Sequence, residues 1–215
     1  MEPTDKSSPL ILTIPGLDNS GPSHWQSLWE GKLPNCHRVD IGMWDAPHRN
    51  TWVNKLNLAI HRVNQPVILV AHSLGCHLVA WWAALERPAA EGHVLGALLV
   101  APPDVEKAPV DKRVTPFAPT PKNMLPFPSI VVGSHNDPYH SFEGTRTLAN
   151  YWGSSFADAG RSGHINGSSN VGDWAFGKSL LNKLSLRGEK RGERLAKRFP
   201  MRDSIAANWN PVIRF

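Results

Sequence analysis

The sequence predicts an α/β protein: a three-layer sandwich with a mostly parallel sheet of about six strands and no cap domain. Two observations lead to this prediction. Short runs of branched apolar residues alternate with longer segments of helical spacing, which is typical of βαβ units in a parallel sheet. The chain also has 215 residues, of which 41% are hydrophobic and 19% charged, and these values suit one globular domain with a large core.

The first half of the domain begins with a short apolar run over residues 10–14, which Pro15-Gly16 ends. Residues 24–29 follow with helical spacing, and residues 38–41 can form a second strand. Asn50 or Thr51 is a candidate N-cap for a helix from 52 to about 63, which stops before Gln65-Pro66. Residues 67–70 then form a branched apolar run, which predicts a buried strand.

The second half continues the alternation. Residues 76–85 have the spacing of a buried helix, and residues 94–100 read as the next strand. A proline-rich loop over 102–128 is too short to build a helical lid. Residues 129–132 and 154–157 predict two more strands, separated by a helix over 141–151. A helix over 173–184 is expected to close the domain.

The sharp turn after residues 67–70 carries the first candidate catalytic residue. Ser73 stands between a strand and a helix, with Ala71 two residues before it and Gly75 two residues after it. This is the layout of a nucleophile elbow, whose neighbours must be small because the serine adopts a strained conformation. Ala71 departs from the usual glycine. The alternative is a plain βα turn in which Ser73 caps the helix.

Two backbone amides are candidates for an oxyanion hole. The N–H of Leu74 lies at a helix start, and that of Leu17 lies in the glycine-containing loop after the first strand. A simple turn at residues 16–22 is the alternative. A phosphate-binding loop is not supported, because the GxxxxGK[ST] pattern is absent.

Candidates for the other triad members follow the last two predicted strands. Asp137 comes just after residues 129–132, and His164 just after residues 154–157, which gives the chain order Ser…Asp…His. His164 would take the Ser73 proton, and Asp137 would orient the imidazole. Asp104, after residues 94–100, is a competing acid. The competing bases are His24, His72, His135 and His140.

Five segments together resemble one family of small serine hydrolases. They are PGLDNSGPSHWQSLW, MWDAPHRNTW, VILVAHSLGCHLV, VVGSHNDPY and SGHIN, and they occur in this order. The chain resembles the proteins similar to retinoblastoma-binding protein 9 and YdeN over roughly residues 9–184. The resemblance implies a lidless α/β-hydrolase fold with esterase-like activity and the triad Ser73, Asp137 and His164.

The excess positive charge belongs to the C-terminal segment. The formal net charge is +5, and residues 185–215 hold eight Lys or Arg against three Asp or Glu, so residues 1–184 are neutral overall. We therefore expect a flexible N-terminus at 1–8, the hydrolase domain at 9–184 and a basic extension at 185–215. The neutral domain is not expected to bind nucleic acid. The basic extension is expected to contact an anionic partner or another subunit, or to be a solvated helix.

No other class of protein has comparable support. No apolar run is long enough to span a membrane, and MEPTDKSSP has no signal core, so we expect a cytoplasmic protein. The two cysteines lack metal spacing, and we expect neither metal nor cofactor. A binding module on a hydrolase scaffold is the alternative function.

The expected substrate is a small ester or amide. Without a lid the site should be an open cleft that favours acyl groups of about two to six carbons, since each buried methylene contributes only about 0.8 kcal/mol. Trp25 and Trp44, near the first two strand ends, are the expected apolar walls of this cleft.

Overall fold

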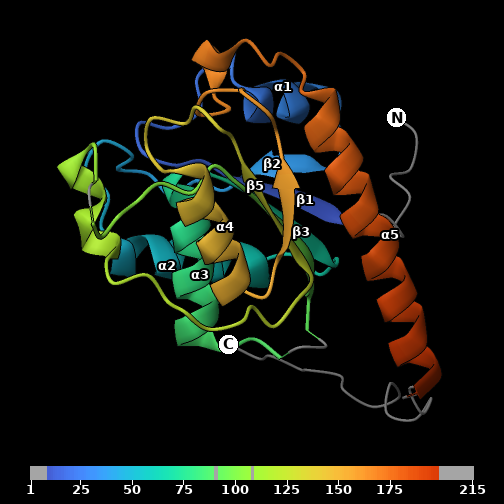
Figure 1. Cartoon of the computed structure of the whole chain (residues 1–215). Coiled ribbons are helices and arrows are strands. Elements are labelled where there is room, and N and C mark those ends of the chain that lie inside the picture. Colours follow the sequence, from blue (N-terminus) through green and yellow to red (C-terminus); the bar gives the residue numbers. More distant parts are fainter. Residues whose placement is uncertain (1–8, 90–91, 108, 199–215) are drawn as a thin grey trace, which may run out of the picture.

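The computed structural model describes residues 9–89, 92–107 and 109–198. Its centre is a six-stranded sheet in the order β2-β1-β3-β4-β5-β6, in which every neighbouring pair is parallel (Figure 1). This confirms the predicted parallel sheet. The strands are β1 (Leu10–Ile14), β2 (Cys36–Arg38), β3 (Val67–His72), β4 (Val94–Val100), β5 (Ser129–Gly133) and β6 (Ser155–Asp158).

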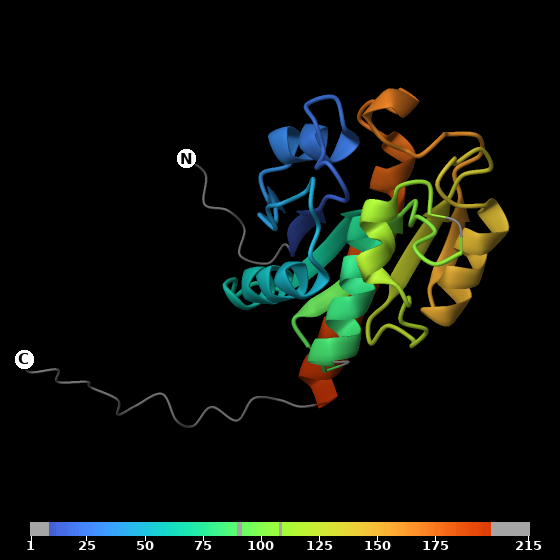
Figure 2. The ribbon, with the colours of Figure 1, turned by 90° about the vertical axis from the view of Figure 1, so that its left-hand side faces the viewer.

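Helices cover both faces of the sheet, which confirms the three-layer sandwich (Figures 1 and 2). One face carries α1 (Trp25–Lys32) and α5 (Ala175–Arg198), and the other carries α2 (Arg49–His61), α3 (Leu74–Glu86) and α4 (Phe142–Tyr151). Two short 3₁₀ helices, η1 (Lys112–Phe117) and η2 (Gly167–Ser169), lie in the connections.

The alternation of side chains along the strands explains why the core has two halves. In β3, Leu69 packs among residues of α2, α3 and α4, while Ile68 and Val70 pack with α1 and α5. All six residues of β3 are buried, as expected for a parallel strand covered on both faces. A polar substitution on either face of β3 would therefore leave an unsatisfied group in a dry core.

Two elements near the N-terminus differ from the prediction. The second strand is β2 at Cys36–Arg38, where three residues pair with β1, rather than residues 38–41. Val39 and Ile41 lie beyond the end of the strand but are buried, so their apolar character reflects burial and not strand pairing. Helix α2 begins earlier than predicted, because the ring of His48 caps it by accepting a hydrogen bond from the Thr51 amide (3.4 Å).

The last helix is longer than predicted. Helix α5 runs from Ala175 to Arg198, whereas the sequence suggested 173–184. An end at Leu184 is predicted because a helix up to this residue covers the sheet. The following residues are rich in Arg, Lys, Glu and Leu, which have high helix propensity. Where the domain ends and the extension begins stays a prediction, and residues 199–215 lie outside the described part of the chain.

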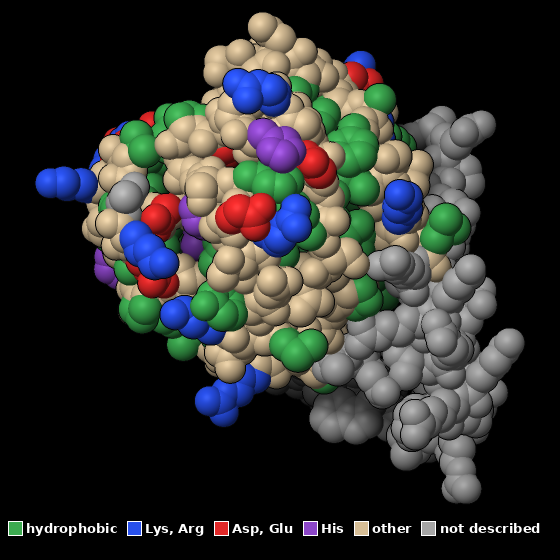
Figure 3. Space-filling model, viewed as in Figure 1, with side chains coloured by type: hydrophobic (Ala, Val, Ile, Leu, Met, Phe, Trp, Pro, Cys, Tyr) green, Lys and Arg blue, Asp and Glu red, His purple; other side chains and the backbone are tan. Residues whose placement is uncertain are grey.

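The described surface and helices carry two further features. No helix among the described residues is long and apolar enough to span a membrane. On the described part of the face in Figure 3, basic and acidic side chains are interspersed, and the apolar ones form small separate groups. This arrangement agrees with the neutral charge balance of residues 1–184.

Candidate active site

Ser73 lies on a strained turn between β3 and α3. Its φ of 53° and ψ of −126° place a non-glycine residue in a sparsely populated region, at a cost of about 1–3 kcal/mol. The Ser73 amide donates to the carbonyl oxygen of Val100 in β4 (2.9 Å), which helps to hold the turn in place. Such a turn projects the hydroxyl beyond the carboxyl end of the sheet, where ligands of parallel sheets gather.

Two glycines let the chain pack against this turn. A Cβ at Gly75 would press on the carbonyl oxygen of Ile14 and lie 2.9 Å from that of Pro15. A Cβ at Gly16 would lie 2.8 Å from the Leu74 nitrogen and 2.8 Å from the Ser73 Cβ. Both positions therefore require glycine, because the clashing atoms are largely backbone and cannot move aside. The contact also brings the loop after β1 against the start of α3.

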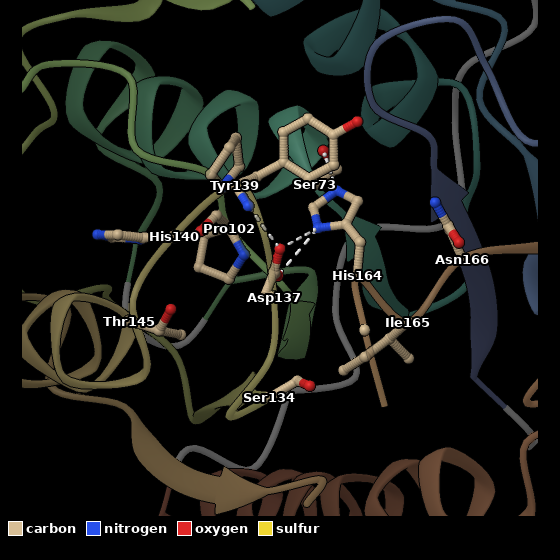
Figure 4. A network of polar contacts seen from close by, with 12 residues as sticks. Ser73, Pro102, Ser134, Asp137, Tyr139, His140, Thr145, His164, Ile165 and Asn166 are labelled. Carbon is tan, nitrogen blue, oxygen red and sulfur yellow. Dashed lines mark hydrogen bonds and ion pairs between the residues drawn. The ribbon is translucent and has the colours of Figure 1, made fainter. Parts of the chain in front are cut away.

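Ser73, His164 and Asp137 form one hydrogen-bonded chain (Figure 4). The Nε2 of His164 is 3.0 Å from Ser73 Oγ, and its Nδ1 is 3.0 and 2.9 Å from the two carboxylate oxygens of Asp137. The side chains of His164 and Asp137 are 9% and 3% exposed. Because the carboxylate is shielded from water and accepts at Nδ1, the imidazole presents a lone pair to the hydroxyl.

The end of β5 orients Asp137. Its Oδ1 accepts a hydrogen bond from the Tyr139 amide (2.9 Å), which fixes the carboxylate (Figure 4). The ring of Tyr139 lies 4.4 Å from that of His164, centroid to centroid. Tyr139 therefore limits the movement of the imidazole while its backbone holds the acid.

His72 supports His164 from the residue beside Ser73. Its Nε2–H donates to the backbone carbonyl oxygen of His164 (2.9 Å), and the two rings meet at an edge, 4.9 Å apart. Burial lowers the pKa of His72 well below its usual value, so the ring is neutral at pH 7. The sequence suggested His72 only as a rival base. Its position directly before the nucleophile, at a strand end, was the available signal for this supporting contact.

The other rival residues have different partners. His135 pairs with Asp158 (2.9 Å), which lowers the pKa of that carboxyl group. The Nδ1 of His140 donates to the Pro102 carbonyl oxygen (3.0 Å). The carboxylate of Asp104 accepts the backbone amides of the two residues at 106 and 107, both at 2.9 Å. Within the described chain, the Ser73 hydroxyl has His164 as its hydrogen-bond partner.

His24 is also a poor base. Burial, with smaller effects from the charges of Arg38 and His164, lowers its pKa to about 4. Its Nδ1 accepts the Gln26 amide (3.1 Å) and so caps α1. Its ring lies 4.6 Å from that of His72. The neutral pair packs beside His164 without adding positive charge.

The two predicted oxyanion amides lie at the junction that Gly16 makes possible. Neither Leu17 N–H nor Leu74 N–H donates a hydrogen bond within the described residues. The amide of Leu74 opens α3, where helix N–H groups have no partner inside the helix. Arg38 braces the loop after β1 by donating to the Asn19 side chain (3.1 Å) and the Ser20 carbonyl (2.9 Å). The arrangement can stabilise negative charge beside Ser73.

A cleft of about 350 Å³ opens over Ser73. It lies between the loop after β1 and the β4–β5 connection, which contains η1. Its charged lining residues are Asp18, Asp104, Asp111 and Arg113. Its apolar lining consists of Leu17, Pro103, Val110, Val114 and Tyr139.

The tryptophans predicted as walls of this cleft do not line it. Trp25 is fully buried in the core below, where its Nε1–H donates to the Ile165 carbonyl (2.8 Å). Trp44 is half-buried and packs against the opposite half of the core. Instead, the proline-rich loop supplies walls through Val110 and Val114. That loop has no periodic pattern, so the sequence carried no signal for which of its residues face Ser73.

The described residues include no group of three His, Cys, Asp or Glu side chains that could hold a metal ion. Both cysteines are buried. Burial raises the pKa of Cys36 to about 12 and that of Cys76 well above its usual value, so both thiols are protonated and poorly nucleophilic.

Comparison with known proteins identifies the family of the chain. The serine hydrolase family matches residues 11–183. A putative YdeN-like hydrolase from Pectobacterium atrosepticum has 29% identity and a TM-score of 0.72, over 86% of this chain and 92% of its own. The ydeN gene product of B. subtilis has 17% identity and a TM-score of 0.66, over 82% and 98%.

More distant structures share the fold. Est1E from Butyrivibrio proteoclasticus, in a structure with bound ferulic acid, has 14% identity and a TM-score of 0.59, over 90% of each chain. A search of curated proteins found no match. The family match covers most of the chain, and the resemblance to YdeN in the motifs agrees with the structural neighbours. The chain therefore belongs to the serine hydrolase family, and within it to the group similar to retinoblastoma-binding protein 9 and YdeN.

Proposed function

We propose that the chain hydrolyses small carboxylic esters or amides through Ser73, His164 and Asp137, with an acyl-enzyme intermediate. The observation that carries this proposal is the 3.0 Å contact between Ser73 Oγ and His164 Nε2, on a strained turn. A binding module would need neither the strain nor the buried Asp137 partner of the imidazole.

In the first step, His164 removes the proton from Ser73 as Oγ attacks the substrate carbonyl carbon. The carbonyl oxygen becomes negative and accepts hydrogen bonds from the backbone N–H groups of Leu17 and Leu74. The imidazolium forms against Asp137, whose nearby carboxylate stabilises the positive charge without taking the proton.

In the second step, the imidazolium gives its proton to the leaving oxygen or nitrogen, and the carbon–heteroatom bond breaks. The acyl group stays on Ser73. Water then attacks the acyl carbon while His164 takes one of its protons, and the same two amides stabilise the second oxyanion. The imidazolium of His164 then gives this proton to Ser73 Oγ as the bond between Oγ and the acyl carbon breaks. This releases the carboxylic acid and restores the starting state.

The lining of the cleft favours a short apolar acyl group. The walls are Leu17, Pro103, Val110 and Val114, and the volume of about 350 Å³ is at the small end of the usual range for ligand sites. We expect the highest kcat/KM for acyl chains of about two to six carbons, because longer chains would leave methylenes in water.

The test is the substitution Ser73→Ala. It should abolish labelling by a fluorophosphonate and reduce turnover of a 4-nitrophenyl butyrate ester by about 10⁴- to 10⁶-fold. Ser179→Ala, on an exposed turn of α5, is the matched control and should behave as the unchanged protein. Unlabelled native protein without turnover would instead favour a binding module on a hydrolase scaffold.

A further inference from the structure

A surface groove adjoins the catalytic cleft at His164. This groove has a volume of about 410 Å³ and shares Tyr139, His164 and Asn166 with the cleft. It lies between the loop after β5 and the segment from the end of β6 to η2. Figure 4 shows Tyr139 and Asn166 on different sides of the His164 ring. The remaining lining comes from Asn136, Pro138, Arg161, Ser162, Gly163, Ser168 and Ser169.

Backbone hydrogen bonds hold the two loops of the groove together. The Ser162 amide donates to Ser134 Oγ (2.9 Å), and the His135 amide donates to the Gly160 carbonyl (2.8 Å). These bonds flank Arg161 on both sides. They fix its backbone at the rim of the groove, three residues before His164.

The amide side chains of the groove present donors. Asn136 Oδ1 accepts from the Gly163 amide (2.9 Å), and Asn166 Oδ1 accepts from the Ser168 amide (3.1 Å). A backbone N–H can only donate, so these contacts fix which atom of each side chain is oxygen. Both NH₂ groups are left without an acceptor among the described residues.

The charge of the groove is also one-sided. Arg161 is its only permanently charged lining residue, and no Asp or Glu lines it. The guanidinium is exposed and has neither an ion pair nor a hydrogen bond in the described chain. With Asn136 and Asn166, it gives three sets of donors around one space. A planar guanidinium and amide donors match the acceptor oxygens of a carboxylate.

We infer that this groove receives the leaving group of the substrate, and that this group is an alcohol or amine that carries a carboxylate. The inference rests on the proposed function. His164 must protonate the departing atom, so the leaving group has to lie against the imidazole, and the groove is the space beside His164 that the oxyanion loop does not line. The apolar walls of the cleft remain for the acyl group.

The test compares two acetate esters of nearly equal size, 4-acetoxybenzoate and 4-acetoxybenzamide. Their leaving groups differ in charge at one position. At low ionic strength the protein should give a kcat/KM about fivefold higher for the benzoate, a difference typical of one exposed ion pair. Arg161→Gln should reduce this ratio to near one, because kcat/KM falls much more for the benzoate than for the benzamide.

The matched control is Arg62→Gln, which removes an exposed arginine at the opposite end of the sheet, after α2. It should leave the ratio unchanged, which separates a local contact from the general field of the protein. Equal rates for the two esters, or a parallel loss of both in Arg161→Gln, would overturn the inference.

A protein that hydrolyses neither ester and is not labelled by a fluorophosphonate would overturn the proposed function itself. Where labelling occurs without turnover, protection of Ser73 by 4-hydroxybenzoate or 4-hydroxybenzamide supplies the same comparison through binding. Better protection by the benzoate, lost in Arg161→Gln, supports the groove. Equal protection contradicts it.

Discussion

The two sides of His164 differ in how their charges are used. On the cleft side, the guanidinium of Arg113 donates to both Asp18 (2.8 and 2.9 Å) and Asp111 (2.7 Å). On the groove side, Arg161 has no such partner among the described residues, and the amide groups of Asn136 and Asn166 have donors to spare.

This difference separates a structural use of charge from a recognition use. The ion pairs of Arg113 connect the loop after β1 with η1 and so support the residue that follows Leu17. A guanidinium that is already paired with carboxylates attracts an anionic ligand only weakly. An arginine such as Arg161, which has no ion-pair partner among the described residues and lies on a fixed backbone, can favour a ligand that carries a carboxylate.

The largest effect on this comparison is expected from Asp137, the acid that orients His164, because His164 borders both the cleft and the groove. Asp137→Asn should reduce kcat by about 10⁴, because an amide would favour the wrong imidazole tautomer. Asp104→Asn is the matched control at the end of β4 and should change kcat only slightly, since its carboxylate accepts backbone amides of its own turn. Steady-state kinetics on both variants distinguishes them. A larger loss in Asp104→Asn would move the acid to β4.

The next effect is on stability, from the neutral histidines at the base of the cleft, His24 and His72. The pKa of His24 is about 4 in the folded protein against 6.5 for the ordinary group, so the unfolded chain binds a proton more readily. Stability should be full above about pH 6.5 and fall as the pH drops towards 4, by at most about 3 kcal/mol for this residue.

Urea unfolding at a series of pH values measures this dependence. His24→Gln should flatten the curve, and the exposed His61→Gln should not. Part of the slope should survive in His24→Gln, because burial also lowers the pKa of His72 and His77. An unchanged slope in His24→Gln would show that its ring is protonated in the folded state.

A smaller loss of stability is expected at the elbow. Gly75→Ala should lower the free energy of unfolding by about 1–3 kcal/mol, because the new methyl group meets the carbonyl oxygens of Ile14 and Pro15. Gly21→Ala is the matched control, since nothing lies within 4 Å of its Cβ position. Thermal unfolding of both variants tests this. Equal melting temperatures would mean that the strand and helix can separate without cost.

The sequence predicted the sheet and the proximity of Ser73, Asp137 and His164 because both depend on local signals. Branched apolar runs predicted the strands, and Ser73, Asp137 and His164 each follow a strand end. The cleft walls could not be predicted in this way. The position of Trp25 near a strand end predicts a cleft wall, yet the core buries this side chain completely. Val110 and Val114 reach the cleft only through the path of an aperiodic loop.

The smallest expected effect is that of Arg113→Gln, which can be compared directly with that of Arg161→Gln. Arg113→Gln should reduce kcat for 4-acetoxybenzoate and 4-acetoxybenzamide by the same factor, about two- to fivefold, because exposed ion pairs contribute little and their loss only loosens the loop next to Leu17. KM should change less than kcat, since the contact supports the loop with the amide proposed to bind the oxyanion and does not touch bound substrate. Arg161→Gln should instead change the ratio between the esters. If Arg113→Gln altered the ratio and Arg161→Gln did not, the carboxylate would be recognised on the cleft side, and the assignment of the two sides of His164 would have to be exchanged.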